Sequence, residues 1–279
     1  MKRIGKPEIA ASQVLTQCAS LIKNKELAAR LLSVIDYVAS AENEYSQHAT
    51  IGQLCAIASS DNVLDIVLGK EMEGMYKGPF RRPSSPLRRV YDAIKLSAPN
   101  GICPLCCQRD ASTLDHYLPV SKFPAFAVTP INLVPACSNC NHIKLSRVSH
   151  TAEDQTIHPY FDDFDGEQWL FSEIIESKPV SAFFYIQPPG NLTITQKKRL
   201  EVHFNTFKLA SLYTTYAAVE LTSRSTRLKR LFDSGGEKAV VGFLEEEELS
   251  ERVVAKNSWQ AALYQALLSS KWFCSGGFM

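Results

Sequence analysis

The stretch that decides the fold is "CPLCCQRDASTLDHYLPVSKFPAFAVTPINLVPACSNCNHIKLS", residues 103–146 of a 279-residue chain. It opens with one CxxC pair, Cys103 and Cys106, and closes with a second, Cys137 and Cys140. Four thiolates are enough for a closed tetrahedral Zn²⁺ site with Zn–S bonds of about 2.3 Å. The competing interpretation is a pair of disulfides or four ordinary thiols. The CxxC spacing favours structural zinc. Disulfides are disfavoured because the basic N-terminal residues are not followed by the apolar run of a secretory signal, so the cysteines are expected to stay reduced.

Polar residues suited to hydrolytic chemistry lie between and beside the two cysteine pairs. They are, in chain order, Asp115, His116, Asn132, Asn141 and Lys144. An isolated "TLDHYLP" would be explained by a surface aspartate beside a half-buried histidine. Inside the cysteine frame, the same residues become candidates for a catalytic site.

The complete pattern resembles the HNH endonuclease family. The matching features are CxxC, a DH pair followed by proline, an NL pair before the second CxxC, and "CNxxK" at the start of a helix. The resemblance covers residues 101–147. It implies a ββα-metal fold and a metal-dependent endonuclease that hydrolyses phosphodiester bonds in nucleic acid.

The resemblance also implies a role for each residue. His116 is the expected general base, and an ordinary imidazole pKa of about 6.5 suits that task near neutral pH. Asp115 and Asn141 are the expected ligands of one Mg²⁺ or Mn²⁺, which prefer oxygen donors. Asn132 is expected to fix the loop that carries the histidine. The third family position is often histidine, and here it is Asn141.

Two features of this segment complicate the assignment. Neighbouring residues of a regular strand point to opposite faces, so Asp115 and His116 share a site only if the strand ends or distorts there. Pro119 favours such an ending. His142 is a rival ligand, but on a helix it is rotated by about 100° from Asn141. Lys144 lies one turn beyond Asn141 and is a candidate phosphate contact.

The flanking regions predict an α+β protein that is mostly helical, with the zinc-stapled ββα-metal module inserted. Helical spacing is clear in "ELAARLLSVIDYVASAENEY" and, from Thr195 onward, in three successive stretches, residues 195–232, 238–254 and 258–270. Residues 50–70 suggest two shorter helices, residues 73–86 a loop, and residues 85–97 a helix with Ser85 at its cap. "QWLFSEIIES" and "VSAFFYIQ" suggest strands joined by a turn. The expected regions are helical residues 1–76, a basic linker and helix 77–100, the HNH module 101–150, and a β-hairpin with helices 151–279.

Charge and composition limit the kinds of binding partner that we expect for this protein. The formal net charge is only +1, but a basic cluster precedes the first cysteine pair. Its candidate nucleic-acid contacts are Arg81, Arg82, Arg88 and Arg89. A solvated surface is the alternative explanation. We expect a cytoplasmic protein without membrane contact, because no apolar run reaches the roughly 18–20 residues that span a bilayer.

The expected substrate is nucleic acid, with DNA favoured over RNA. By analogy with bacterial antiviral defence systems, which often pair an HNH nuclease with an ATPase, an ATPase is a candidate protein partner. The rival function is a non-catalytic zinc module that binds nucleic acid or a protein. His158 in "HPYFDDFD" is either an additional site residue or part of a buried aromatic turn.

Overall fold

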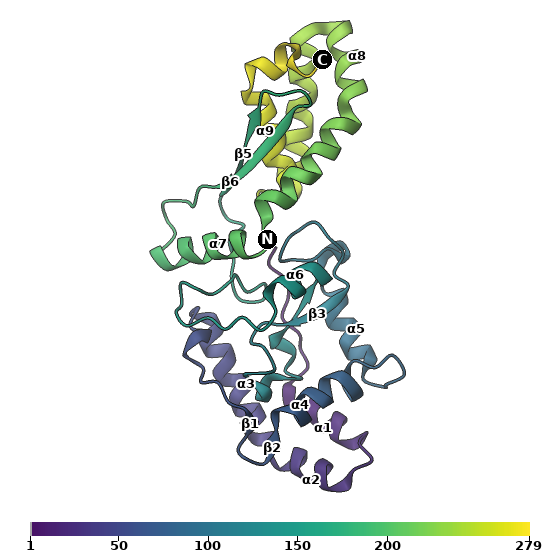
Figure 1. The fold of residues 1–279 in the computed structure, drawn as a ribbon, viewed down its shortest axis with the longest axis vertical. Coiled ribbons are helices and arrows are strands. Elements are labelled where there is room, and N and C mark those ends of the chain that lie inside the picture. The colour runs from purple at the N-terminus through teal and green to yellow at the C-terminus, as the bar shows by residue number, and fades with distance from the viewer. Residues whose placement is uncertain (1) are drawn as a thin grey trace. The chain divides into compact units, whose positions relative to one another are not determined.

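In the computed structural model, which describes residues 2–279, the chain divides into two compact units (Figure 1). One ends at Asp163 and the other begins at Phe164. The fold is α+β and mostly helical, as the sequence predicts. The first unit contains the first three of the four expected regions and the beginning of the fourth. Within residues 2–279, no helix is both long and apolar enough to cross a membrane.

The first unit is built from short elements around one core. They are α1 (Ala11–Ser20), α2 (Lys25–Ser33), α3 (Ile35–Thr50), β1 (Asn62–Val63), β2 (Val67–Leu68), α4 (Gly69–Met75), the π-helical turn η2 (Tyr76–Phe80), α5 (Arg88–Leu96), β3 (Thr113–His116), β4 (Leu133–Ala136) and α6 (Ser138–Lys144). The helix expected over "ELAARLLSVIDYVASAENEY" is broken at Val34, between α2 and α3. The φ and ψ angles of Val34, −103° and 5°, lie outside the helical range. This break lets Leu31 on α2 and Val38 on α3 both reach the core.

The prediction of two short helices at residues 50–70 is wrong. The structure has a 3₁₀ turn, η1 (Leu54–Ala56), followed by the small hairpin β1–β2. Leu64 and Asp65 adopt positive φ angles of 55° and 56°, which a tight hairpin turn requires. The Asn62 side chain holds that turn by accepting a hydrogen bond from the Asp65 amide at 2.9 Å. Local turn chemistry therefore overrides the helical spacing of the apolar residues.

The prediction of a loop at residues 73–86 is also wrong in its first half. Helix α4 runs into the turn η2, which continues to Phe80 in spite of a proline. Tyr76 and Phe80 are buried there, so aromatic burial outweighs the glycine and proline signals. Helix α5 begins at Arg88, and Ser85 caps the turn before it by accepting from the Leu87 amide at 3.2 Å.

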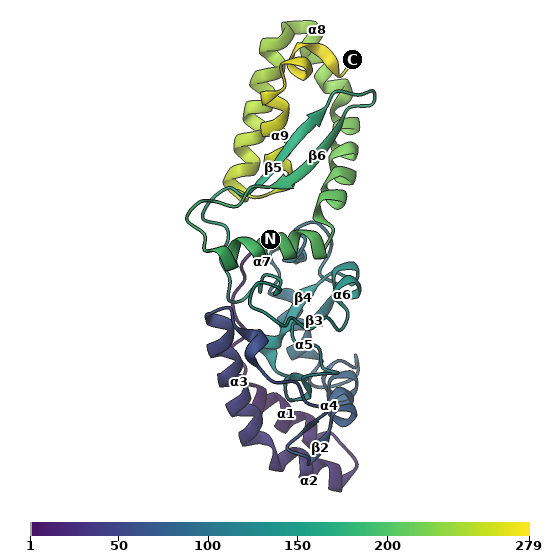
Figure 2. The same cartoon turned by 60° about the vertical axis from the view of Figure 1, so that its left-hand side comes forward.

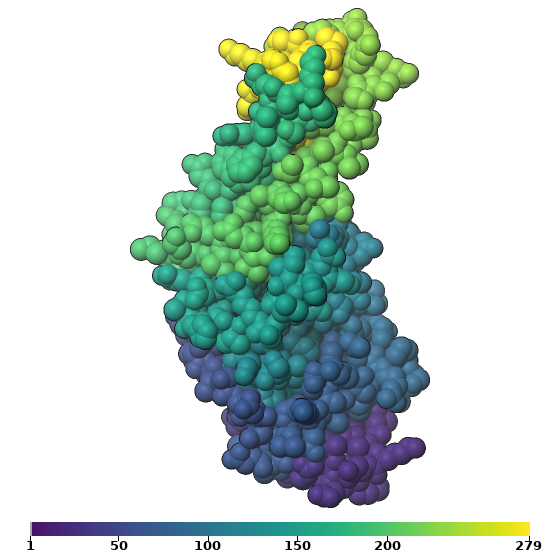
Figure 3. Space-filling model, viewed as in Figure 1, coloured from purple at the N-terminus to yellow at the C-terminus, as the bar shows by residue number. Residues whose placement is uncertain are grey.

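Strands β3 and β4 form an antiparallel pair in which Asp115 faces Val134 and His116 faces Leu133. Leu114 and Leu133 enter the hydrophobic core together with residues of α1, α2, α4 and α5. The second edge of β3 is closed by two tyrosines: the Tyr76 hydroxyl donates to the Leu114 carbonyl, and the Tyr91 hydroxyl accepts from the Leu114 amide. Figure 3 shows the teal cysteine-rich segment packed directly against the blue segment that precedes it.

The second unit joins a hairpin to helices. Its elements are β5 (Leu170–Ile175), β6 (Ser181–Ile186), α7 (Ile194–Thr206), α8 (Leu209–Val254) and α9 (Trp259–Ser269). The expected strands are confirmed, and β5 pairs with β6 in antiparallel register. Ala182 and Phe184 on β6 are buried, whereas Phe183 between them is 52% exposed. One face of the hairpin therefore packs on α8 and α9, and the other face is open (Figure 2).

Helix α8 consists of two antiparallel arms. A straight helix would separate Arg224 from Glu247 by about 35 Å. Their side chains lie 3.7 Å apart, and the Arg227 guanidinium lies 4.1 Å from the centre of the Phe243 ring. The arms meet at Gly236, where a φ of 61° and a ψ of −154° are accessible only to glycine. The sequence predicts two separate helical stretches at this place, so the break is confirmed.

Candidate functional site

The four cysteines of the two CxxC pairs come together as expected. Their sulfur atoms all lie within 4.8 Å of one another, and all four residues are buried. Cys137 is also the N-cap residue of α6, because its sulfur accepts a hydrogen bond from the Cys140 amide at 3.3 Å. Zn–S bonds of about 2.3 Å place tetrahedral sulfur atoms about 3.8 Å apart, so a small contraction would fit the cluster to zinc. The cluster therefore could hold Zn²⁺.

The cysteine knuckle is shaped by the backbone around it. The Cys103 amide donates to the Arg109 carbonyl at 2.8 Å, and the Cys107 amide donates to the Cys103 carbonyl at 2.8 Å. Cys107 has a φ of 50° and directs its sulfur to the Pro104 carbonyl, outside the cluster. Four buried thiolates repel one another, so only a bound cation allows all four to be ionised at once.

Strand β3 ends at His116, and the two adjacent candidate residues have different surroundings. The Asp115 carboxylate turns toward α6 and pairs with the Lys144 ammonium, with Oδ2 and Nζ 3.1 Å apart. Both residues are buried, Asp115 being 4% and Lys144 5% exposed. The same ammonium donates to the His116 carbonyl at 2.6 Å. Burial raises the pKa of Asp115, and the Lys144 charge opposes that rise.

The His116 ring is held in one orientation by a backbone acceptor. Its Nε2 lies 2.8 Å from the Ala127 carbonyl oxygen. Because a carbonyl oxygen can only accept, Nε2 carries the proton and Nδ1 keeps the lone pair. The Tyr76 ring packs edge-on against the imidazole, with ring centres 4.4 Å apart. Burial lowers the pKa of His116 to about 4, so the imidazole is neutral at pH 7.

Asn132 joins two loops beside the histidine. Its side chain is fully buried. Its Oδ1 accepts from the Leu118 amide at 2.7 Å, and its Nδ2 donates to the carbonyls of Leu118 and Phe126 at 3.0 and 3.2 Å. The backbone just after His116 is thereby fixed to the loop that leads to Ala127, which is the histidine's own acceptor.

The remaining expected ligand, Asn141, lies in the middle of α6 and is partly exposed. Within residues 2–279 its side-chain amide makes no hydrogen bond, so its oxygen is uncommitted. His142, the rival ligand, is exposed. One carboxylate and one amide are chemically suited to Mg²⁺, which commonly keeps several waters and takes further oxygens from substrate phosphate. A cation at Asp115 would, however, have to share the carboxylate with Lys144.

Three of the four predicted basic residues line one cleft of about 460 Å³. Its lining residues are Lys77, Arg81, Arg82, Pro83, Arg88, Tyr91, Ser112 and Thr113. Arg88 is paired with Asp92 at 2.9 Å. Arg81 and Arg82 have no carboxylate partner among the described residues. Arg89 lies elsewhere, in a more apolar groove beside the N-terminal segment. The cleft reaches the start of β3, the strand that ends at His116.

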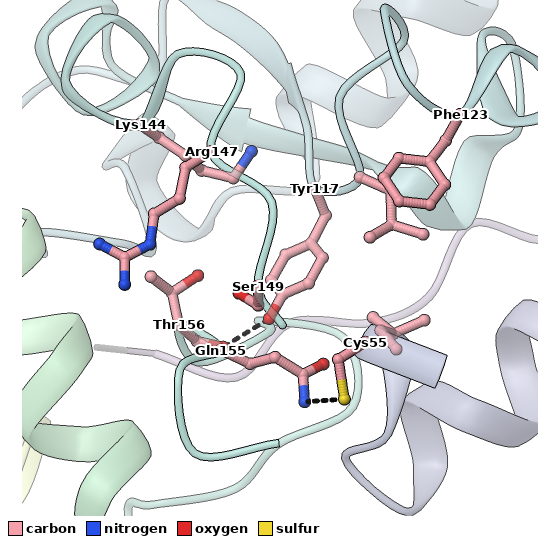
Figure 4. A pocket seen from close by; sticks show the side chains of 10 residues that line it. Cys55, Tyr117, Phe123, Lys144, Arg147, Ser149, Gln155 and Thr156 are labelled. Atoms are coloured by element: carbon pink, nitrogen blue, oxygen red, sulfur yellow. Dashed lines mark hydrogen bonds between the residues drawn. The ribbon is translucent and has the colours of Figure 1, made fainter. Parts of the chain in front are cut away.

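A second, much smaller cavity is lined by Lys144 together with Tyr117 and Gln155 (Figure 4). Its volume is about 20 Å³, which is room for one or two water molecules. The Tyr117 hydroxyl donates to the Thr156 carbonyl at its edge. The Gln155 amide nitrogen donates to the Gly52 carbonyl at 2.6 Å. Gln155 is 1% exposed, and its Oε1 has no hydrogen-bond partner among the described residues.

His158 lies in an aromatic cluster of the core. Its Nδ1 accepts from the Tyr160 amide at 3.2 Å, and its Nε2 is 2.9 Å from the Tyr45 hydroxyl. The ring also packs against Tyr117, with centres 4.3 Å apart. Both ring nitrogens are therefore engaged, which favours the buried aromatic turn over a role in the site.

Sequence reasoning missed the burial of Lys144 and the tyrosines that close the edge of β3. The partners of Lys144 lie 28 and 29 positions earlier in the chain, so helical spacing alone gave no sign of them. A lysine at the last position of a short helix that follows a cysteine knuckle is close enough to the preceding hairpin to reach it. That proximity was the one available signal.

Comparison with known proteins gives one relationship over the full length. Protein ea31 of Escherichia phage lambda is 27% identical, and the alignment covers 99% of this chain and all of that protein. No family model and no solved structure matches the chain. The chain is therefore similar from end to end to a phage protein, in both of its units.

Proposed function

We propose that this protein is an endonuclease of the HNH type that hydrolyses phosphodiester bonds in nucleic acid. The observation that carries the proposal is the placement of His116. A neutral imidazole with Nδ1 free for a proton lies at the end of a strand, directly after a buried carboxylate in the sequence, on a hairpin whose second strand leads into the zinc-suited cysteine cluster. Asn132 and Lys144 fix that strand end from two sides.

In the proposed reaction, each group has one task. His116 Nδ1 accepts a proton from the attacking water, and the Ala127 carbonyl keeps the ring in the tautomer that allows this. Asp115 and Asn141 would hold Mg²⁺ or Mn²⁺, which would neutralise charge on the phosphate. Arg81 and Arg82 in the basic cleft would bind flanking phosphates. The bond between phosphorus and the 3′ oxygen would break as water attacks, and the leaving oxygen would take a proton from solvent. The resemblance to the HNH family implies ends that carry 5′-phosphate and 3′-hydroxyl groups.

The rival function is a zinc module that binds nucleic acid without cutting it. The Asp115–Lys144 ion pair favours this alternative, because a carboxylate that already has a buried partner is in the state expected of a structural residue. The basic cleft serves either function equally well.

A substrate panel separates the two functions. Purified zinc-loaded protein is incubated with plasmid, single-stranded circular DNA and structured RNA, with Mg²⁺ or Mn²⁺ and with EDTA. The proposal expects cleavage of at least one polymer that EDTA abolishes. Binding in a mobility-shift assay with no cleavage under any metal condition would establish the rival function.

The cleft is tested by removing its unpaired charges. Arg81→Gln with Arg82→Gln should weaken binding of nucleic acid and flatten its salt dependence by about two phosphate contacts. Arg89→Gln should have the smaller effect, because Arg89 does not line the cleft. If Arg81→Gln, Arg82→Gln and Arg89→Gln, each made singly, weaken binding of nucleic acid equally, the cleft is not the nucleic-acid contact.

The protein partner, with an ATPase as the expected kind, and a role in antiviral defence stay predictions. The second unit carries none of the proposed site residues, so it is the part of the chain where we would seek that partner first. Co-purification of the full chain with the products of neighbouring genes tests both.

A further inference from the structure

A second cleft adjoins the basic cleft, and Arg82 lines both of them. Its volume is about 440 Å³, within the range of about 300–1,000 Å³ that is typical of ligand sites. Lys77 lines the basic cleft, whereas its chain neighbour Gly78 lines the second one. The chain from Lys77 to Arg82 therefore forms the border between the two clefts. We call the second one the Leu21 cleft, after an exposed leucine that lines it.

The Leu21 cleft is open where two glycines lack side chains. Gly74 on α4 and Gly78 in η2 both line it, and a Cβ atom built on either would meet nothing within 4 Å among the described residues. Gly74 lies inside a helix and has no positive φ, so its backbone does not require glycine. Alanine would be the better helix former there. The room at Gly74 is therefore not explained by packing or by backbone geometry.

The walls of the Leu21 cleft combine apolar surface with uncommitted polar groups. Leu21 itself is 43% exposed. The Arg82 guanidinium and the Ser84 hydroxyl make no hydrogen bond or ion pair within residues 2–279. Among the described residues that line this cleft and the basic cleft, none is acidic. A ligand that matches these walls has an apolar body with a negative charge beside it. The other apolar residues of the lining are Ile22, Met75, Pro79 and Pro86.

A nucleotide has this combination of groups. Its base has two apolar faces and a polar edge, and the phosphate next to the base is anionic. In a duplex the faces are covered by stacking, so only an unpaired base, or one turned out of the helix, can enter a cleft. A single strand with its phosphates in the basic cleft would bring one base past Arg82 into the Leu21 cleft.

We propose that the Leu21 cleft binds one unpaired base of a nucleic-acid strand whose neighbouring phosphate contacts Arg82. Single-stranded or locally unpaired nucleic acid is then the preferred substrate class. The inference rests on the proposed function for nucleic acid as the ligand. It concerns binding without cleavage, so it can fail while duplex DNA is cut, and it can hold while nothing is cut.

The test is the affinity of the zinc-loaded full chain for three fluorescent DNA probes of equal length, without added Mg²⁺ or Mn²⁺. The probes are a single strand, the same strand with abasic residues throughout, and the duplex. The unaltered protein should bind the single strand at least about fivefold more tightly than the abasic strand, because base contacts add to the phosphate contacts. Equal affinities for these two probes would overturn the proposal, as would failure to bind the single strand.

Gly74→Leu fills the cleft and supplies the decisive comparison. It should weaken binding of the single strand by at least about fivefold and leave the affinities for the abasic strand and the duplex unchanged, since those probes place no base in the cleft. Gly5→Leu is the matched control, because Gly5 also meets open space and lines the separate groove beside Arg89.

Two results with a folded Gly74→Leu protein would contradict the proposal. Unaltered affinity for the single strand is the outcome expected if a partner peptide occupies the cleft instead. Equal losses of affinity for all three probes would show that the leucine blocks the path of the backbone and not the place of a base.

Nuclear magnetic resonance of the unaltered protein keeps the proposal falsifiable if Gly74→Leu does not fold. Met75 lines the Leu21 cleft, whereas Met279 lies in the second unit. In protein that carries ¹³C-methyl methionine, the signal that is lost in Met75→Leu should shift when the single strand is added and stay in place with the abasic strand. The Met279 signal should stay in place with both. A Met75 signal that does not move at saturating single-stranded DNA would overturn the proposal.

Discussion

The two larger hairpins of this molecule have the same topology and are stabilised in different ways. In β5–β6, Phe184 is buried and Phe183 is 52% exposed, so the hairpin is held by one apolar face against helices. In β3–β4, six of the eight strand residues are buried, and the charged Asp115 is one of them. Asn132, just before β4, is a second buried polar residue. A hairpin that buries polar groups needs partners for each of them, whereas one that buries a single apolar face does not.

That contrast explains where chemistry is possible. The β5–β6 hairpin offers no pair of polar groups in a protected environment. The β3–β4 hairpin holds an imidazole, a carboxylate and an ammonium in fixed positions, with the cysteine cluster at its base. Rigid positioning of a few polar groups is what a catalytic site requires.

Loss of zinc should give the largest difference in stability between the β3–β4 and β5–β6 hairpins. Cys103→Ser removes one of four thiolates from a site whose metal can contribute on the order of 10 kcal/mol to folding. We expect loss of zinc by metal analysis and rapid hydrogen exchange at the β3–β4 amides, while the β5–β6 amides stay protected. A zinc content equal to that of the unaltered protein would show that the cluster is not the zinc site.

Removing a buried ring from the second unit should destabilise the β5–β6 hairpin and leave the zinc affinity unchanged. Phe184→Ala should lower the free energy of unfolding of that unit by about 3–5 kcal/mol, because a fully buried ring is removed. The matched substitution Phe183→Ala, on the exposed face of the same strand, should change it by less than about 0.5 kcal/mol. Denaturant unfolding measures both. Altered zinc affinity in Phe184→Ala would contradict the independence of the two hairpins.

Asn132→Ala should destabilise the first unit by about 2–4 kcal/mol, because three buried backbone groups lose their partner. Asn139→Ala is the control, since Asn139 is an exposed asparagine of α6. Thermal unfolding compares the two. Similar stability of both variants would show that the loop after His116 is fixed by other contacts.

The burial of His116 should appear in the pH dependence of stability. An unfolded histidine has a pKa of about 6.5, and the folded pKa is lowered to about 4, so between these values the unfolded state binds more protons. Stability should therefore decrease as pH falls from about 6.5 toward 4, by up to about 3 kcal/mol. His116→Gln should lack this contribution. Parallel stability–pH curves for the two proteins would exclude the lowered pKa.

Much of this arrangement could be predicted from local sequence. CxxC spacing correctly brought four distant thiols together, and alternation of apolar residues correctly located β5 and β6. The break in α8 followed from "SGG", where helical spacing is interrupted. These features depend on neighbours within a few positions, or on a motif whose spacing suits one metal ion.

The rest depended on contacts between distant segments. The turn η2 forms because Tyr76 and Phe80 find room in the core, which overrides a proline and a glycine. Lys144 is buried because Asp115 and the His116 carbonyl accept its charge from another element. Neither partner of Lys144 is close to it in sequence, so helical periodicity and capping patterns could not indicate these contacts.

The most direct test of the central claim is the single-turnover cleavage rate of His116→Ala on the substrate that the unaltered protein cuts. His150→Ala, an exposed histidine outside the hairpin, is the matched control. We expect His116→Ala to lose about 10²–10⁴-fold in rate with its zinc and its unfolding transition intact, and His150→Ala to cut normally. Equal rates for His116→Ala and the unaltered protein would contradict the assignment of the base, and with it the proposed site.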